Sequence, residues 1–372
     1  MDTPPPLEEV DRSEELVSRV CAIDIAKASG MVCVRLPHDS LPGRRAPGAG
    51  RRVQRTWTLP ATTNTILDLA DHLVCQSVSR VVMEATGAYW KPWFYLLEAR
   101  GLEVWLVNAR QVKNVPGRPQ TDKLDAVWLA KLTERGMLSP SFVPPKPIRQ
   151  LWDLTRTRTV FTDERSRHKQ RVEKILEDAQ IKLSSVATDI FGVSGRAMLD
   201  ALVAGERDPK VLAEMARARM RTKKDALAEA LKGNFEDHHA RLITILLQTV
   251  DHLTTQIDRL TADVERVIAA LPTPDNDGGG GGGGMSLVER LDEIPGIGPG
   301  IAQVVIAELG CDMSVFPTAD HLASRAKLSP GTIQSGTKNT SGKTGKGNTW
   351  PKRALGEAAM SAAKTDTFLG AR

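Results

Sequence analysis

The stretch SRVCAIDIAKASGMVCVRLP, residues 18–37, decides how the first part of this chain folds. Two runs of β-branched and other apolar residues flank a short segment with Gly30, a pattern typical of two strands around a glycine turn. The first strand is expected to end with Ala22–Ile25, which places Asp24 at the end of a buried strand. We therefore predict a β-sheet that begins here and carries an acidic side chain at a strand end.

The residues that follow alternate between strand and helix patterns. Strands that first meander and then alternate with helices predict a mixed α/β domain over residues 18–141, with helices on both faces of the sheet. Residues 1–17 are acidic and rich in proline, and we expect them to be disordered. The further predicted elements are strands at 53–59, 79–85 and 102–108 and helices at 63–76, 89–101 and 121–136.

The middle of the chain has the pattern of long helices. The segment FVPPKP, residues 142–147, predicts a stiff linker, and residues 148–271 form a charged helical, coiled-coil region. Its last part steps by four and three in an a/d seam, which favours an assembly with a second chain. The alternative is a long helix packed against the helix expected at 150–183 of the same chain. The seam residues are Leu246, Val250, Leu253, Ile257, Leu260, Val264, Val267 and Leu271.

A flexible linker separates this region from the C-terminal block. Seven consecutive glycines at 278–284 mark the linker, residues 272–285, as a domain boundary. The block at 286–372 contains LDEIPGIGPGIAQVVIAELG, residues 291–310, which predicts two helices around a Pro-Gly turn. This is similar to a helix-hairpin-helix, in which amides at the start of the second helix grip phosphates. A plain tight turn between packed helices is the alternative.

Composition limits the kind of protein this can be. The 372 residues carry 50 Lys and Arg against 45 Asp and Glu, a mild excess that suggests an anionic partner. The four cysteines form no C-x-x-C pair, so neither a disulfide framework nor a zinc site is expected. No apolar run approaches a membrane-spanning length, and the acidic N-terminus is unlike a signal peptide. We expect a cytoplasmic protein of two or three domains, with no membrane partner.

Four carboxylates occupy positions that suit metal-dependent chemistry. Asp24 and Glu84 end two predicted strands, and Asp122 and Asp125 share one face at the start of the 121–136 helix. Four carboxylates that converge would repel one another unless a cation holds them, and their hard oxygens suit Mg²⁺ or Mn²⁺ beside a scissile phosphate. For each residue alone, the alternative is a solvated strand end or a partner of the helix dipole.

Several segments of the sequence resemble those of one protein family. They are AIDIAK (22–27), VMEATGAYW (82–90), VNARQVKNVPGRPQTDKLDAVWLAKL (107–132), the 291–310 stretch, LSPGTIQSGTKNTSGKTGKGN (328–348) and RALGEAA (353–359). In these segments the chain is similar to the DEDD transposases of insertion sequence family 110, and the similarity extends from about residue 19 to residue 372. Residues 108–126 are the most specific part of the resemblance.

The resemblance implies a fold and a set of functional residues. It implies a RuvC-like (RNase H-type) N-terminal domain whose Asp-Glu-Asp-Asp set matches Asp24, Glu84, Asp122 and Asp125. It also implies a coiled-coil insertion and a small, mainly α C-terminal transposase domain with a nucleophilic serine. Finally, it implies a structured non-coding guide (bridge) RNA that pairs with donor and target DNA, while the protein recognises the shape of the RNA.

The nucleophilic serine of the family precedes a glycine and matches Ser335, with Ser341 in a second Ser-Gly pair as the fallback. Both lie in TIQSGTKNTSGKTGKGNTW, residues 332–350, which has almost no large apolar residue and is expected to be a basic, phosphate-binding loop. A serine hydroxyl there could form a covalent ester with a DNA strand, helped by metal at the distant carboxylates. A plain loop-forming serine is the alternative.

Basic residues in two parts of the chain are predicted to contact nucleic acid. Residues 321–356 contain seven basic residues and no acidic one, and the arginine loop at 43–55 is a candidate RNA contact. The predicted nucleic-acid-binding residues are Arg110, Lys113, Arg118, Lys123, Lys327, Lys338, Lys343, Lys346 and Arg353.

Three functions fit these observations. The first is an RNA-guided DNA recombinase of a bacterial insertion sequence, a homo-oligomer (dimer or tetramer) that acts on the nucleoid through a phosphoserine intermediate. The second is a metal-dependent nuclease or Holliday-junction resolvase, in which the four carboxylates cut through activated water. The third is a nucleic-acid-binding protein without catalytic activity. A denaturation-resistant protein–DNA adduct would distinguish the first from the other two.

Overall fold

The computed structural model describes residues 17–37, 52–85, 87–108, 122–271, 285–316, 318–326, 328, 330–335, 338–344 and 348–366. Its internal contacts divide the chain into two units, residues 1–143 and 144–372. The boundary falls within the segment expected to be a linker. The second unit holds both the helical region and the C-terminal block, which the sequence had suggested as separate domains.

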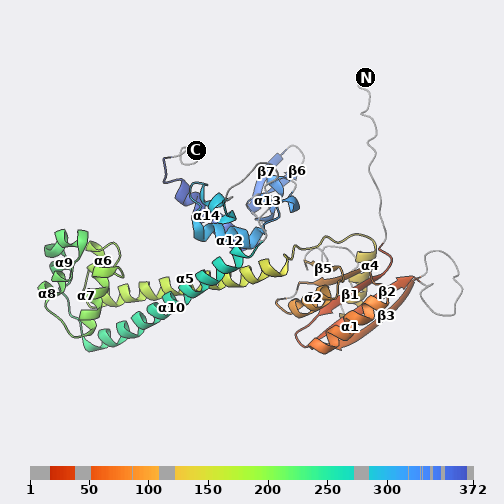
Figure 1. Ribbon diagram of the computed structural model, residues 1–372, viewed down its shortest axis with the longest axis horizontal. Coiled ribbons are helices and arrows are strands. Elements are labelled where there is room, and N and C mark those ends of the chain that lie inside the picture. Colours follow the sequence, from red (N-terminus) through yellow and green to blue (C-terminus); the bar gives the residue numbers. More distant parts are fainter. Residues whose placement is uncertain are drawn as a thin grey trace, which may run out of the picture. The chain divides into compact units, whose positions relative to one another are not determined.

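The first unit contains a five-stranded mixed sheet (Figure 1). β1 (Val20–Ile25), β2 (Ser29–Pro37) and β3 (Arg52–Pro60) form an antiparallel meander. β4 (Arg80–Glu84) and β5 (Val104–Val107) continue the sheet parallel to β1, in the order β3-β2-β1-β4-β5. This mixed α/β arrangement is the one predicted, and it is consistent with an RNase H-type domain.

Helices cover both faces of this sheet, as the sequence predicted. α1 (Thr63–Cys75) and α2 (Trp90–Ala99) contribute to one hydrophobic core with alternate strand residues. α4 (Asp122–Glu134) forms a second core with the opposite face of the strands. The side chains of each strand alternate between these two cores because successive residues in a strand point to opposite faces.

Gly30 has a different role from the predicted one. The turn between the first two strands lies at residues 26–28, and Gly30 is already in β2, paired with Ile25. A Cβ atom on Gly30 would lie 2.7 Å from the ring of Trp93, closer than van der Waals contact allows. Glycine is therefore needed here so that α2 can pack its buried tryptophan against the strand.

Two long antiparallel helices form the body of the second unit (Figure 1). α5 (Lys146–Asp178) and α10 (Asp237–Ala269) have 33 residues each. Residues near the start of α5 share a core with residues near the end of α10, and the end of α5 shares another with the start of α10. This antiparallel packing buries several of the a/d positions of α10 and leaves Leu246, Leu260 and Val267 half-buried.

The a/d seam therefore pairs helices of one chain. Val250, Leu253, Ile257 and Val264 are each less than 9% exposed within the single chain. The alternative of packing against the 150–183 helix therefore holds for these four residues, and an assembly of chains through the seam stays a prediction. Periodicity identifies an apolar stripe but does not specify which helix covers it.

A small helical lobe connects the two long helices and has a hydrophobic core of its own. It lies at the left of Figure 1. The sequence predicted helix here but not a separate lobe. Its elements are α6 (Leu183–Val186), α7 (Val193–Val203), α8 (Pro209–Glu214), the 3₁₀ helix η2 (Ala218–Lys223) and α9 (Lys224–Ala230).

The C-terminal block packs on the first half of α5. α12 (Pro299–Leu309) contacts α5, α11 (Leu287–Asp292) and α14 (Thr349–Ala362). The predicted helix–turn–helix at 291–310 is therefore present, with its first helix ending at Asp292. Between α12 and α14 lie η3 (Met313–Val315), α13 (Ala319–Arg325) and the strands β6 (Pro330–Ser335) and β7 (Lys338–Thr344). None of the helices in the described parts of the chain is long and apolar enough to cross a membrane.

Candidate active site

Asp24 and Glu84 lie at the carboxyl ends of adjacent parallel strands. β1 and β4 pair in parallel with Ile23 opposite Met83, so the next residue on each strand is one of these two carboxylates. Both side chains are half-buried. The strand-end positions inferred from the sequence are therefore neighbouring positions in the sheet.

The two carboxylates also share one face of the sheet. Ala22 and Val82, two residues before them, belong to the core beneath α4. Because strand side chains alternate with a period of two, Asp24 and Glu84 are on the α4 face as well.

The direction of α4 brings a third carboxylate to this corner. Glu134, at the end of α4, accepts a hydrogen bond from Arg35 Nε at 2.9 Å, and Arg35 pairs with Val20, the first residue of β1. The end of α4 thus lies at the amino end of β1, and its start lies at the carboxyl end with Asp24 and Glu84. Asp125, in the first turn of α4, is half-buried there.

Three of the four predicted carboxylates therefore share one end and one face of the sheet. Asp122 opens α4 at the same end, and its side chain lies outside the described residues. An all-oxygen donor set suits a hard cation such as Mg²⁺ or Mn²⁺. Asp24, Glu84 and Asp125 each have at least one interaction within the protein, so none of these carboxylates is free.

The tightest group of possible metal ligands within the described residues is elsewhere. Ligand atoms of Asp178, His238 and His239 all lie within 4.8 Å of one another where α5 ends and α10 begins. His239 Nδ1 accepts the backbone N–H of Glu236 at 3.0 Å, so that nitrogen carries no proton. In the neutral ring the proton is then on Nε2, which lies 3.1 Å from Asp178 Oδ2 and donates to it. This chemistry makes His239 part of the cap of α10 and leaves no ring nitrogen of His239 for a metal.

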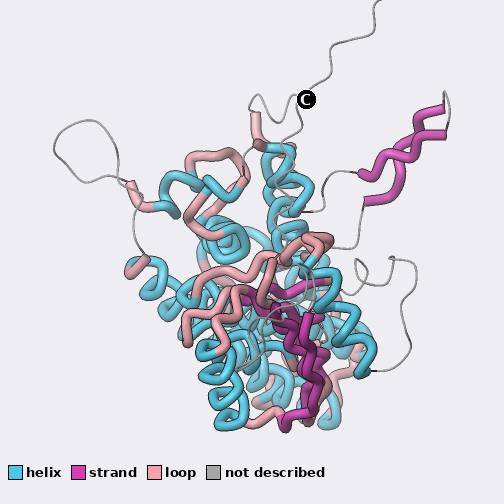
Figure 2. Tube along the Cα trace, turned by 90° about the vertical axis from the view of Figure 1, so that its right-hand side faces the viewer, coloured by secondary structure: helices cyan, strands magenta, loops and turns pink. Residues whose placement is uncertain are grey.

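The predicted serine loop is partly a β-hairpin. Ser335 is the last residue of β6 and pairs with Lys338 at the start of β7, while Ser341 lies within β7 opposite Thr332. Ser335 is therefore at the end of its strand and Ser341 is in the middle of one; both strands are among those drawn in magenta in Figure 2. The expectation of a loop over 332–350 is wrong for the residues of β6 and β7. Residues such as Thr and Ile favour strands, and they can form a paired strand even where the sequence has no long apolar run. The two serine side chains lie outside the described residues.

Most of the predicted nucleic-acid contacts fall outside the described side chains. Lys123 is described, and it is exposed on α4. Arg110, Lys113, Arg118, Lys327 and Lys346, together with much of the 43–55 arginine loop, are not described, nor are the side chains of Lys338 and Lys343.

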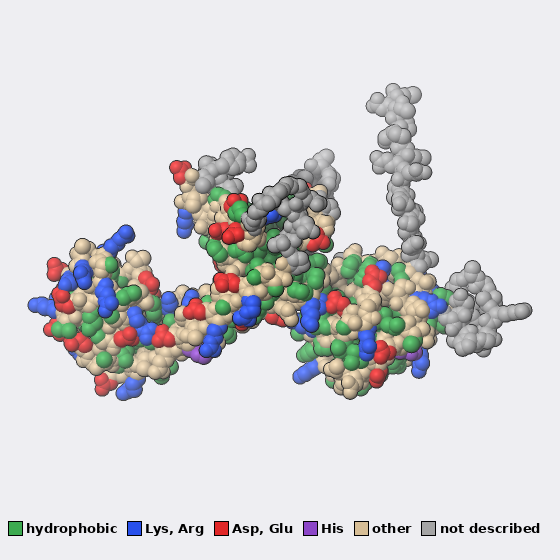
Figure 3. All heavy atoms as spheres, in the orientation of Figure 1, with side chains coloured by type: hydrophobic (Ala, Val, Ile, Leu, Met, Phe, Trp, Pro, Cys, Tyr) green, Lys and Arg blue, Asp and Glu red, His purple; other side chains and the backbone are tan. Residues whose placement is uncertain are grey.

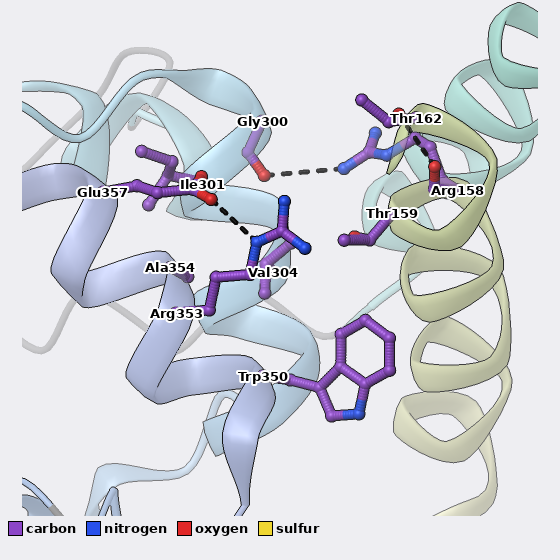
Figure 4. Close-up of a pocket in the computed structure, with 10 residues that line it drawn as sticks. All are labelled: Arg158, Thr159, Thr162, Gly300, Ile301, Val304, Trp350, Arg353, Ala354 and Glu357. Atoms are coloured by element: carbon purple, nitrogen blue, oxygen red, sulfur yellow. Dashed lines mark hydrogen bonds and ion pairs between the residues drawn. The ribbon is translucent and has the colours of Figure 1, made fainter. Parts of the chain in front are cut away.

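Arg353 is engaged within the protein. Its guanidinium donates to Asp163 on α5 at 2.6 and 2.8 Å and to Glu357 on α14 at 2.8 Å. The hydrogen bond from Arg353 holds the pKa of Asp163 below its usual value. Figure 4 shows Arg353 at a cleft of about 250 Å³ between α5, α12 and α14. These ion pairs give Arg353 a role in docking α14 on α5.

Sequence reasoning missed the most basic segment of the helical lobe. Residues 217–224 read RARMRTKK, with five basic residues in eight and no acidic one. That count was visible in the sequence and could have identified the segment. We call Arg217, Arg219, Arg221, Lys223 and Lys224 the basic ridge.

Comparison with known families gives two matches. A DEDD family model described as "Transposase" matches residues 21–181, which include Asp24, Glu84 and Asp125. A second model, "Transposase IS116/IS110/IS902 family", matches residues 288–369, which include the β6–β7 hairpin with Ser335. No curated protein sequence matches the chain.

Proposed function

Because this chain belongs to the IS110 family of transposases, and so acts on DNA, we propose that it cuts and rejoins DNA strands through a covalent bond to Ser335. The observation that carries the proposal is the convergence of Asp24, Glu84 and Asp125 at one corner of the sheet, inside the region that the first family model matches. Ser335 lies inside the region that the second model matches.

In this proposal Asp24, Glu84, Asp122 and Asp125 hold Mg²⁺ or Mn²⁺. The carboxylates supply hard oxygen ligands. Because they lie at one corner of the sheet, their negative charges repel one another, and a bound cation would reduce that repulsion. A bound divalent ion would neutralise charge on a scissile phosphate and lower the pKa of a hydroxyl.

Ser335 supplies the nucleophile. Its hydroxyl oxygen bonds to phosphorus while the bond from phosphorus to a sugar oxygen breaks; the serine proton is lost and the sugar oxygen gains one. The phosphoserine ester conserves the energy of the broken phosphodiester bond. A sugar hydroxyl of another DNA strand can therefore attack the phosphorus, release the serine and join the two strands. A position beside the turn of a hairpin suits a residue that must reach a large substrate.

The finer parts of the proposal concern partners. We propose a structured non-coding guide RNA that pairs with donor and target DNA, and a homo-oligomer that acts on the bacterial nucleoid. Support for these comes from the family resemblance, which spans both matched regions.

Adduct trapping tests the proposal. Full-length protein is incubated with element-end DNA, its flanking RNA and Mg²⁺, denatured, and examined for a protein–DNA band. Wild type and Ser341→Ala should form the adduct, and Ser335→Ala should not. Loss of the adduct in Ser341→Ala alone would identify Ser341, in the middle of β7, as the nucleophile instead. DNA cleavage with no adduct in any variant would favour the nuclease alternative, in which the carboxylates act alone.

A further inference from the structure

The basic ridge is a run of five basic residues on the surface of the helical lobe, with Glu214 and Asp225 as the nearest acidic residues in sequence. Arg217, Arg219, Arg221 and Lys223 are exposed, and Lys224 is half-buried. No acidic residue occurs between Met215 and Lys224. In Figure 3, Lys and Arg side chains project from the lobe at the left of the view.

Two cations of the lobe have carboxylate partners, whereas the three arginines of the ridge have none among the described residues. Arg196 on α7 binds Asp200 and Asp251, and Lys224 lies 2.5 Å from Glu214. The structure gives Arg217, Arg219 and Arg221 no carboxylate partner among the described residues. Like charges this close in sequence repel one another, and an anionic partner would remove that cost.

The backbone holds the ridge in a fixed shape. Arg217 N donates to the hydroxyl of the buried Ser194 at 2.9 Å, and Met220 packs inward against the core of the lobe. Lys223 Nζ donates to the carbonyl of Val186 at 3.1 Å. Ala218 has a φ of +47°, a strained conformation for a residue with a side chain. A strained, pinned turn that presents three unpaired arginines is more typical of a binding surface than of a solvated loop.

We propose that the basic ridge binds the phosphodiester backbone of a nucleic acid. Guanidinium groups match phosphate oxygens in a two-pronged geometry, and backbone contacts need no base-specific side chain. The one large apolar residue of the segment, Met220, packs inward, which argues against insertion into a lipid surface. The inference rests on the proposed function only for the presence of nucleic acid, and it is independent of the serine chemistry.

A charge-matched comparison tests the ridge in the full-length protein. One variant combines Arg217→Gln, Arg219→Gln and Arg221→Gln. The control combines Arg171→Gln, Arg241→Gln and Arg259→Gln, which are exposed on α5 and α10 and remove the same charge without clustering. Binding to a DNA duplex and to an RNA hairpin with the same number of phosphates is measured over a range of salt concentrations, and thermal unfolding checks each fold.

The ridge variant should bind at least about tenfold more weakly at low salt, with the slope of log K against log salt reduced by about 2. The control should change that slope by less than about 1. Loss with DNA alone assigns a DNA backbone, and loss with RNA alone assigns an RNA backbone. Equal behaviour of ridge variant and control with both probes would overturn the proposal, as would competition by polyglutamate as strong as that by nucleic acid.

The same proteins separate this inference from the serine mechanism. If wild type forms the covalent adduct while the ridge variant binds like the control, only the ridge inference fails. If the ridge variant loses binding while no adduct forms with wild type, the ridge stands and the serine mechanism fails.

Discussion

At the scale of single residues, position in the fold explains more than residue type. Glu134 is an ordinary acidic residue in the sequence, yet its hydrogen bond to Arg35 and its ion pair with Arg52 hold the end of α4 over the amino end of β1, in addition to the apolar packing of this helix. That orientation places Asp125 beside Asp24 and Glu84. The three candidate ligands therefore depend on an ion-pair cluster at the far end of the same helix.

Two glycines of the 291–310 turn also differ in their surroundings, although they are the same residue type. Gly296 has a φ of +89°, and a Cβ atom there would lie 2.3 Å from the carbonyl oxygen of Ala358 on α14. Gly298, two residues on, has open space around it and a φ of −85°. The turn therefore needs glycine at position 296 so that α14 can pack there. At position 298 the described residues leave room for a larger side chain.

Gly296→Ala should destabilise the second unit strongly. Left-handed backbone strain and the clash with α14 together should lower the free energy of unfolding by about 2–4 kcal/mol. Gly298→Ala, the matched control, should change it by less than about 1 kcal/mol, because a Cβ atom there meets no neighbour and only the poorer N-cap preference of alanine is felt. Chemical denaturation measures both. Equal losses in the two variants would show that Gly296 is not packed against α14.

At the scale of elements, the antiparallel pair of α5 and α10 organises the second unit. Its two ends belong to different cores, one shared with the lobe and one with α12. Each core contributes buried apolar residues from both long helices, so the pair supports the lobe and the C-terminal block together. The buried part of the seam on α10 therefore contributes to the folding of a single chain.

Ile257→Ala should lower the free energy of unfolding by about 2–4 kcal/mol, because it removes a buried side chain from the seam. Ile245→Ala, on the same helix but 60% exposed, should cost less than about 0.5 kcal/mol. Light scattering should give the same mass for both variants and wild type. A lower mass for Ile257→Ala alone would mean that the seam joins chains after all.

The elements that the sequence predicted well are those with strong apolar patterns. Alternating and continuous apolar runs identified the strands that end near Asp24 and Glu84 and the helices over the sheet. The β6–β7 hairpin was missed because polar residues such as Thr, Asn and Lys fill it and give no apolar signal. Carboxylate positions could be predicted because strand ends are local features; the approach of α4 could not, because it depends on an ion pair between residues 99 apart.

At the scale of the whole molecule, the residues of the proposed function are divided between two units. The candidate metal ligands are in the first unit, and the candidate nucleophile and the basic ridge are in the second. Each of the two matched regions contributes one chemical component of the proposed reaction. Tests of the chemistry therefore need the full chain.

Magnesium should stabilise the protein through the carboxylate corner. Saturation at 100 times the dissociation constant is worth about 2.7 kcal/mol, so wild type should unfold at a higher temperature with Mg²⁺. Asp24→Asn should lose most of this shift, because one ligand of the cation is gone. His238→Ala, in the other possible ligand group, should keep the shift. The reverse pattern would place the metal where α5 meets α10.

The most direct test of the proposed mechanism is to find which residue carries the DNA. Trapped adduct is digested with nuclease and protease, and the peptide that retains a nucleotide is sequenced by mass spectrometry. We expect the nucleotide on Ser335, in the peptide that contains the end of β6. A nucleotide on another residue, or cleaved DNA with no modified peptide, would contradict the account.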